Sequence, residues 1–79
     1  LPLVGFAQKT QSEIKASARA TQFLVSKGLD LSIVIRKAAE SVEGVGGGHN
    51  IAAGATIPSG KEEEFLEKFE KGVKEQLSP

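Results

Sequence analysis

A run of glycines in the middle of the chain constrains the fold more than any other sequence feature. Four of the first five residues of the segment 44–55 are glycine, and a block of small residues follows. Glycine loses more backbone freedom on folding than any other residue, so neither a helix nor a strand is favoured there. We therefore expect a loop, and four glycines exceed the single one that commonly ends a helix.

The glycine run also predicts a close approach of the backbone to another group. Successive N–H groups of such a loop can form a concave site for an anion. The only histidine, His49, directly follows Gly48 and could act there as a donor, proton carrier or ligand. The run fits neither the Walker loop nor the dinucleotide-binding fingerprint, and it follows a predicted helix instead of opening one. A flexible connection without a ligand stays open as an alternative.

Two stretches have the apolar spacing of amphipathic helices. The first helix follows a capping residue, Asp30 or Ser32, and ends before Gly44. The second is expected to open with a capping box from Ser59 to Glu62 and to run to about Leu77. The apolar stripe of the first helix consists of Leu31, Val34, Ile35, Ala38, Ala39 and Val42, and that of the second of Phe65, Leu66, Phe69, Val73 and Leu77.

Three further segments are predicted to be strands. Residues 3–8 are apolar and suit a buried strand, whereas residues 13–21 alternate between apolar and polar side chains, as in a strand with one buried face. These two segments suggest an N-terminal hairpin, and residues 51–57 form the third strand. A short helical turn is possible between Thr21 and Gly28. The sequence thus predicts an α+β fold, a small mixed β-sheet with helices packed on it, in the order β-β-(α)-α-β-α.

Composition excludes several classes of function. The chain carries ten basic and ten acidic residues, so it lacks the cationic excess for avid binding along a nucleic-acid backbone. It contains no Cys, one Asp and one His, which is too few to expect a metal site within these residues. Ser17 and Arg19 share the polar face of the second predicted strand. Arginine suits bidentate phosphate contact, although the residues alone favour a solvated strand face for the pair.

The segment from Gly46 to Ala55 resembles the G-G-G-H-x-x-A-A-G-A signature of the DHH-associated domain. The segment from Lys15 to Arg19 is similar to that family's strand with an S-x-R pattern, and the order of elements agrees over nearly the whole chain. This domain is the C-terminal, substrate-binding half of DHH-superfamily phosphoesterases. They include RecJ-like exonucleases, nano-RNases and cyclic-dinucleotide phosphodiesterases. The run through Pro58 most resembles archaeal RecJ-like members.

The resemblance implies a role for each matching residue. The glycines and His49 would face the substrate phosphates, with His49 near the scissile one, and Arg19 would hold a phosphate with help from Ser17. The residues implied to bind substrate are Ser17, Arg19, Gly46, Gly47, Gly48, His49 and Asn50. Catalysis would use Mn²⁺ or Mg²⁺ held by a separate N-terminal DHH domain, so this chain would bind substrate without hydrolysing it.

We expect residues 1–79 to form a single DHH-associated domain from the C-terminal part of a longer, cytoplasmic protein, because the chain begins at Leu1 and contains no Met. Its expected partners are its own DHH domain and single-stranded nucleic acid, an oligonucleotide or a nucleotide, with no membrane. Three alternatives stay open. They are a nucleotide or cyclic-dinucleotide phosphodiesterase of the same superfamily, the related C-terminal domain of an alanyl-tRNA synthetase, and a purely structural interaction domain.

Overall fold

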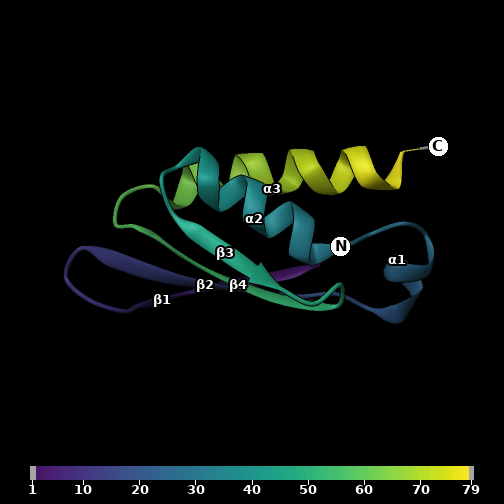
Figure 1. Ribbon diagram of the computed structural model, residues 1–79, viewed down its shortest axis with the longest axis horizontal. Helices are drawn as coiled ribbons and strands as arrows, with labels where there is room; N and C mark the ends of the chain where they lie inside the picture. The colour runs from purple at the N-terminus through teal and green to yellow at the C-terminus, as the bar shows by residue number, and fades with distance from the viewer. Residues whose placement is uncertain (1, 79) are drawn as a thin grey trace.

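The computed structural model, which describes residues 2–78, has one antiparallel sheet and three helices (Figure 1). The elements follow one another as β1 (Leu3–Gln8), β2 (Glu13–Arg19), α1 (Gln22–Ser26), α2 (Leu31–Ser41), β3 (Val45–Gly48), β4 (Ala52–Pro58) and α3 (Glu62–Leu77). Neighbouring strands pair in the order β1-β2-β4-β3, and every pair is antiparallel. The expected α+β class is confirmed, and the sheet is antiparallel throughout where a mixed one was expected.

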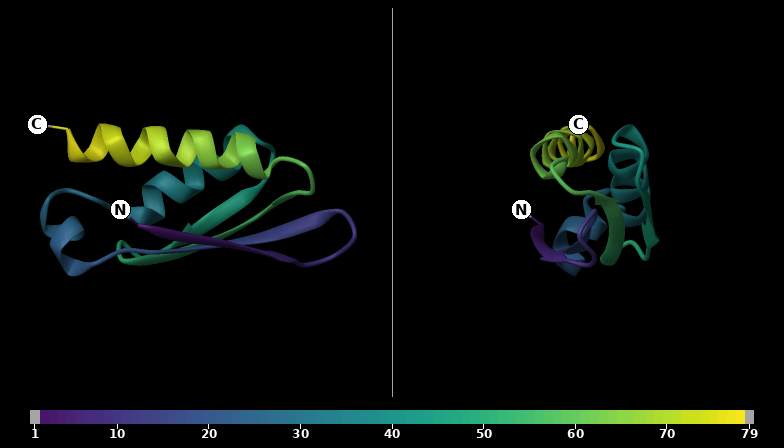
Figure 2. Two further views of the ribbon diagram at one scale, coloured as in Figure 1. Left: turned by 180° about the vertical axis from the view of Figure 1, so that it is seen from behind. Right: turned by 90° about the vertical axis from the view of Figure 1, so that its left-hand side faces the viewer.

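Helices α2 and α3 cover one face of the sheet and leave the other face bare. Figure 2 shows this layering from behind and from one end, with both long helices on the same side of the strands. The core between the layers consists of Ile14, Ala16, Ala18, Leu29, Leu31, Val34, Ile35, Ala38, Ala39, Val42, Ala55, Ile57, Phe65, Phe69 and Val73. The domain therefore has two layers, and one sheet face is free for function.

The predicted apolar stripes form this core. All six residues of the first stripe are buried, as are Phe65, Phe69 and Val73 of the second, whereas Leu66 and Leu77 are half-buried. Strand β2 alternates as expected, with Ile14, Ala16 and Ala18 buried and the polar residues between them exposed. The short helix α1 is also present, and Thr21 caps it by accepting a hydrogen bond from the Leu24 N–H.

Strand β1 is not the buried strand that its composition suggested. It lies at the edge of the sheet, and Leu3 is 77% exposed. Phe6 reaches the core side, where its ring meets Phe65 edge to face at 6.0 Å, yet it remains 40% exposed. Apolar composition therefore does not distinguish a buried strand from an edge strand, which pairs with only one neighbouring strand.

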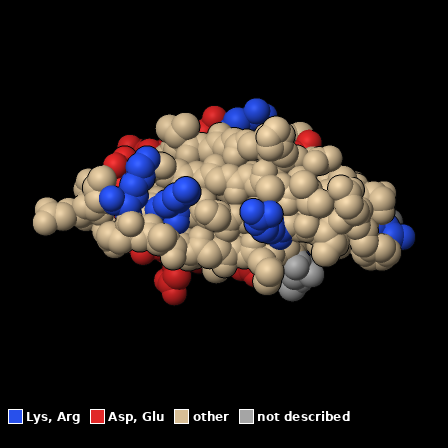
Figure 3. All heavy atoms as spheres, turned by 90° about the horizontal axis from the view of Figure 1, so that it is seen from below, with Lys and Arg blue, Asp and Glu red and all other residues tan. Residues whose placement is uncertain are grey.

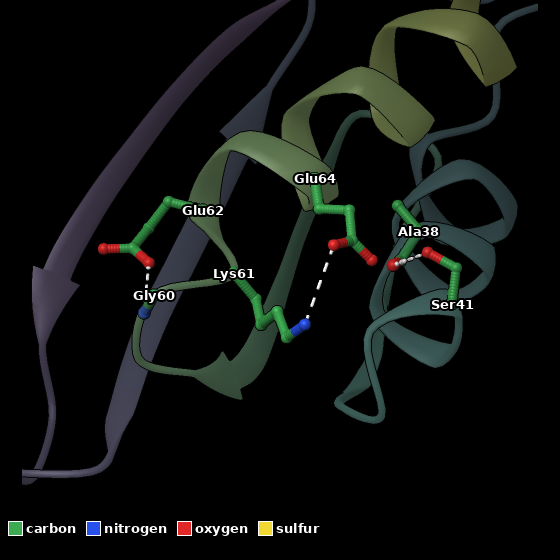
Figure 4. Close-up of polar contacts among 6 residues, drawn as sticks. All are labelled: Ala38, Ser41, Gly60, Lys61, Glu62 and Glu64. Atoms are coloured by element: carbon green, nitrogen blue, oxygen red, sulfur yellow. Dashed lines mark hydrogen bonds and ion pairs between the residues drawn. The ribbon is translucent and has the colours of Figure 1, made fainter.

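The two long helices begin differently. Asp30 caps α2 as predicted, since its Oδ1 accepts the Ser32 N–H at 3.0 Å. The predicted capping box of α3 is wrong, because Lys61 is the N-cap residue and makes no side-chain capping bond. Ser59 is instead held by the β1–β2 turn, where its N–H donates to the Ser12 carbonyl at 2.9 Å. Figure 4 shows the resulting start of α3, where Glu62 accepts the Gly60 N–H at 2.7 Å.

The glycine run is a strand and not the expected loop. Gly46, Gly47 and Gly48 belong to β3 and pair with Ala55, Gly54 and Ala53 of β4. This added strand changes the expected order to β-β-α-α-β-β-α. Only residues 49–51 connect β3 to β4, so His49 lies in a tight hairpin turn.

Candidate functional site

The register of the sheet gathers most of the predicted site residues on the bare face. Successive side chains of a strand alternate between the two faces, so residues two apart share a face. Because Ala16 and Ala18 point into the core, Ser17 and Arg19 belong to the bare face. Ser17 pairs with Gly54, which pairs with Gly47, and Ser17 also pairs with Gly5 on its other side. One row across all four strands therefore reads Gly5, Ser17, Gly54, Gly47.

This central row is a trough without side chains apart from that of Ser17. It crosses three strand spacings of about 4.8 Å, so it is roughly 14 Å long. The next row on one side contains Arg19, which pairs with Ala52, and His49 donates its N–H to the Ala52 carbonyl at 2.8 Å. The backbones of Arg19 and His49 thus lie on either side of Ala52 at the same end of the sheet. They are two strand spacings, or about 10 Å, apart. Both are exposed.

The glycines of the run serve two different purposes, according to the face they occupy. A Cβ atom on Gly46 would lie 3.0 Å from the Ile35 carbonyl oxygen and 3.2 Å from the Cβ of Ala39, so α2 packs directly on this glycine. A Cβ on Gly48 would lie 2.6 Å from the Cα of Ala53, and the φ of Gly48 is 143°. Packing and backbone conformation therefore account for both.

The glycines of the bare face have no such explanation. A Cβ on Gly47 or Gly5 would meet nothing within 4 Å, and one on Gly54 would make only an ordinary contact of 3.4 Å. Glycine in a strand weakens it and often marks a place where a ligand or another backbone approaches closely. The trough is therefore a surface that a ligand can reach down to the backbone.

The predicted anion site of converging glycine N–H groups is not formed. In an antiparallel pair, residues that exchange hydrogen bonds alternate with residues that do not. His49 donates to Ala52, so Gly47 and Gly54 form the next bonded pair, and the N–H groups of Gly46 and Gly48 point toward the free edge of β3. Asn50 is exposed in the turn, and its carbonyl accepts the Leu31 N–H at 3.0 Å, so its backbone ties the turn to α2.

Cations that the sequence did not single out line the other side of the trough. Lys15 is exposed and belongs to the same face of β2 as Arg19. Lys9 reaches across the sheet, and its Nζ donates to Thr56 Oγ1 at 3.2 Å. These lysines, with Gly47, Gly54 and Thr56, line an open hollow of about 680 Å³. The alternation of β2 could have identified Lys15, whereas Lys9 depends on the hairpin and its register.

The charge of this face is positive along its middle. Figure 3 views the molecule from the side of the bare face and shows Lys and Arg side chains along its middle, with Asp and Glu at the margins. Between residues 2 and 78, the only ion pair joins Lys61 to Glu64, so Lys9, Lys15 and Arg19 form no direct ion pair. This arrangement can attract and orient an anion without a large net charge on the domain.

Two other predicted properties concern metals and membranes. Within the described part of the chain, no three His, Cys, Asp or Glu side chains come together as a metal-binding group. Over the same residues, no helix has the length and apolar character that crossing a membrane requires.

The fold defines a small α+β domain, whose helices cover only one side of an antiparallel sheet. The chain belongs to the DHHA1 domain family, the DHH-associated domain of DHH-superfamily proteins, since the sequence profile of the DHHA1 domain matches residues 1–75. DHHA1 domains usually accompany an N-terminal DHH domain.

Known proteins resemble the chain in sequence and in fold. It is 39% identical over 77 residues to an uncharacterized protein of Methanocaldococcus jannaschii, and the match spans 96% of this chain but 17% of that protein. The fold is similar to that of the C-Ala domain from Aquifex aeolicus alanyl-tRNA synthetase, with a TM-score of 0.66 and 20% identity. That likeness covers 95% of this chain and 66% of the other, and at this identity it concerns the fold alone.

Proposed function

We propose that this domain binds the phosphates of a nucleic acid or nucleotide on its bare sheet face, as the substrate-binding part of a DHH-family phosphoesterase of the RecJ-like type. The observation that carries the proposal is the glycine trough, whose three glycines no packing requires. The exposed Arg19 and His49 flank the same end of this trough. Membership of the DHHA1 family supports a phosphoesterase as the parent protein.

The chemistry of these groups suits a phosphate at the end of the trough. A guanidinium offers two parallel N–H donors to phosphate oxygens, and imidazole offers a further donor or a proton. Absent side chains at Gly47 and Gly54 let the phosphate approach the backbone. Donors fixed before the reaction stabilise the charge that develops on phosphate in the transition state. Ser17, in the centre of the trough, adds one hydroxyl.

The metal ions of the proposed reaction would be held outside this chain. Mn²⁺ or Mg²⁺ bound by a DHH domain would supply the nucleophile and neutralise charge on the phosphate. The residues described here would bind and orient the substrate against that centre. Gly46 and Gly48 would contribute by keeping β3 close to α2 and β4, and Asn50 by fixing the turn that carries His49.

Nuclear magnetic resonance of the chain tests the location of the site. Titration with thymidine monophosphate should shift the amide signals of Arg19 and of residues 46–50 first. Arg19→Gln should abolish these shifts, whereas Arg36→Gln, which changes an exposed arginine on α2, should leave them intact. Shifts confined to α3 would contradict the proposal.

Kinetics of the complete phosphoesterase test the role of His49. His49→Ala should lower kcat by roughly 100-fold or more, the scale that follows loss of one fixed donor to a developing oxyanion. His49→Gln keeps a side-chain donor and should lose less activity. Near-normal turnover of His49→Ala would remove His49 from the reacting phosphate.

A further inference from the structure

The cations of the bare face fall into two groups that a single phosphate cannot bridge. Arg19 lies at one end of β2 and Lys15 four residues earlier on the same face. At about 3.4 Å per residue, their backbones are roughly 14 Å apart. The row of Ser17, Gly54 and Gly47 lies between them, and Gly47 and Gly54 of that row line the same hollow as Lys15.

The second group consists of Lys15 and Lys9, and the sheet register and a hydrogen bond bring these two lysines together. Lys9 comes from the β1–β2 turn, and its Nζ is positioned by Thr56 Oγ1 at 3.2 Å. Thr56 is the register partner of Lys15 on the adjacent strand. The Lys9 ammonium therefore lies on the hydroxyl of the residue that pairs with Lys15, and both lysines line the same hollow as Gly47 and Gly54.

We infer that Lys9, Lys15 and Thr56 form a second anion subsite, so that the bare face binds an oligonucleotide through at least two phosphates and not a mononucleotide alone. This inference rests on the proposed function of the Arg19 and His49 end. One phosphate binds beside Arg19, the backbone of the ligand crosses the trough, and a later phosphate binds between the two lysines.

Acidic residues lie beyond the second subsite, on the side away from Arg19. Glu13 lies two residues before Lys15, and its Oε1 accepts the Thr10 hydroxyl at 3.3 Å. Glu43 lines an adjoining hollow together with Lys9 and Glu13. These carboxylates disfavour a further phosphate in that direction, so the face suits a short segment of single strand instead of a long one.

Binding of a thymidine tetranucleotide, compared with thymidine monophosphate, tests the inference on the 79-residue chain. The double variant Lys9→Gln/Lys15→Gln should weaken tetranucleotide binding by about 10-fold or more, the scale of lost charge-assisted contacts. It should leave monophosphate binding unchanged. The slope of log K against log salt should fall in magnitude by roughly 0.7, the contribution of one phosphate contact of a single strand.

Matched variants separate this subsite from a general charge effect. Lys68→Gln/Lys71→Gln removes the same charge from exposed positions of α3 and should change neither ligand's affinity. Lys9→Arg/Lys15→Arg keeps the charge and should restore most of the tetranucleotide affinity. Equal weakening by the α3 control, or unchanged tetranucleotide affinity in Lys9→Gln/Lys15→Gln, would overturn the second subsite.

The outcomes also distinguish the two proposals. If monophosphate binds near Arg19 but the tetranucleotide gains nothing from Lys9 and Lys15, the second subsite is refuted and the proposed function stands. If neither ligand shifts the signals of Arg19 and residues 46–50, both proposals are refuted. Tighter binding of the tetranucleotide that depends on both ends of the face supports both.

Discussion

Alanine substitutions at Gly44 and Gly47 should change stability in opposite directions, although the two glycines are three residues apart in one run. A Cβ on Gly44 would lie 2.5 Å from the Thr56 carbonyl oxygen and 2.9 Å from Ile57 Cγ2. Backbone must move to relieve such a contact, and overpacking costs about 1–3 kcal/mol. Alanine also restricts the unfolded chain more than glycine does, and this effect offsets about 0.4–1 kcal/mol of the loss of stability. A net loss of about 1–2 kcal/mol follows for Gly44→Ala.

The same substitution at Gly47 meets nothing within 4 Å, so only the unfolded-state gain remains. Gly47→Ala should therefore stabilise the domain by about 0.4–1 kcal/mol. A domain of this size shifts its Tm by about 4–8 °C per kcal/mol. We expect Tm to fall by roughly 4–16 °C for Gly44→Ala and to rise by roughly 2–8 °C for Gly47→Ala.

Thermal unfolding followed by circular dichroism, with urea denaturation as a second measure, can resolve changes of this size. The two variants differ by one methyl group each from the same parent, so they control for each other. Loss of stability in Gly47→Ala comparable to that in Gly44→Ala would refute the division of the glycines by sheet face. Gly47→Val should in addition weaken thymidine monophosphate binding while the domain stays folded, because a larger side chain fills the trough.

The remaining predictions concern the helices and the core. Asp30→Ala should destabilise the domain by about 1 kcal/mol because it removes the N-cap of α2, whereas Asp30→Asn should keep most of that stability in urea denaturation. Phe65→Ala should cost about 3–5 kcal/mol, a large share of the roughly 4–12 kcal/mol expected for a domain of this length, and should show as loss of cooperative thermal unfolding. Lys61→Ala, which removes the exposed ion pair with Glu64 seen in Figure 4, should change the free energy of unfolding by less than about 1 kcal/mol. A large effect of Lys61→Ala would mean that the pair is coupled to the start of α3.

The elements that the sequence predicted are those whose signal is local. The stripe of α2 repeats over three turns, its cap lies next to it, and the alternation of β2 continues for seven residues. Each of these patterns is decided by neighbours along the chain. The helices and one strand face could therefore be assigned without knowledge of the tertiary structure.

The misassigned elements depend on distant partners. Gly46 and its neighbours form a strand because β4 pairs with them and α2 packs on them, and this tertiary context overrides the low strand propensity of glycine. Ser59 does not cap α3 because the β1–β2 turn, far away in sequence, binds both its N–H and its hydroxyl. Strand β1 looked buried because its composition is apolar, but only the sheet order shows that it is an edge.

The candidate site has the same division between local and distant information. The face shared by Ser17 and Arg19 follows from alternation alone, whereas their proximity to Gly47 and His49 requires the register of β4 with both neighbours. Lys9 could not have been assigned to the site from sequence, because its contact with Thr56 spans 47 positions. Pairing register therefore supplied what motif spacing could not.

The glycine run shows why a motif of this kind carries two kinds of information. On the core side, Gly44, Gly46 and Gly48 are required by close packing, so their presence says nothing about a ligand. On the bare side, Gly47 and Gly54 contact little, and larger residues would stabilise the strands. Because a larger residue would stabilise the strands, the glycines at these two positions indicate that a side chain there has a cost other than lost stability. The proposed ligand, an oligonucleotide that approaches the backbone between two groups of cations, would account for that cost.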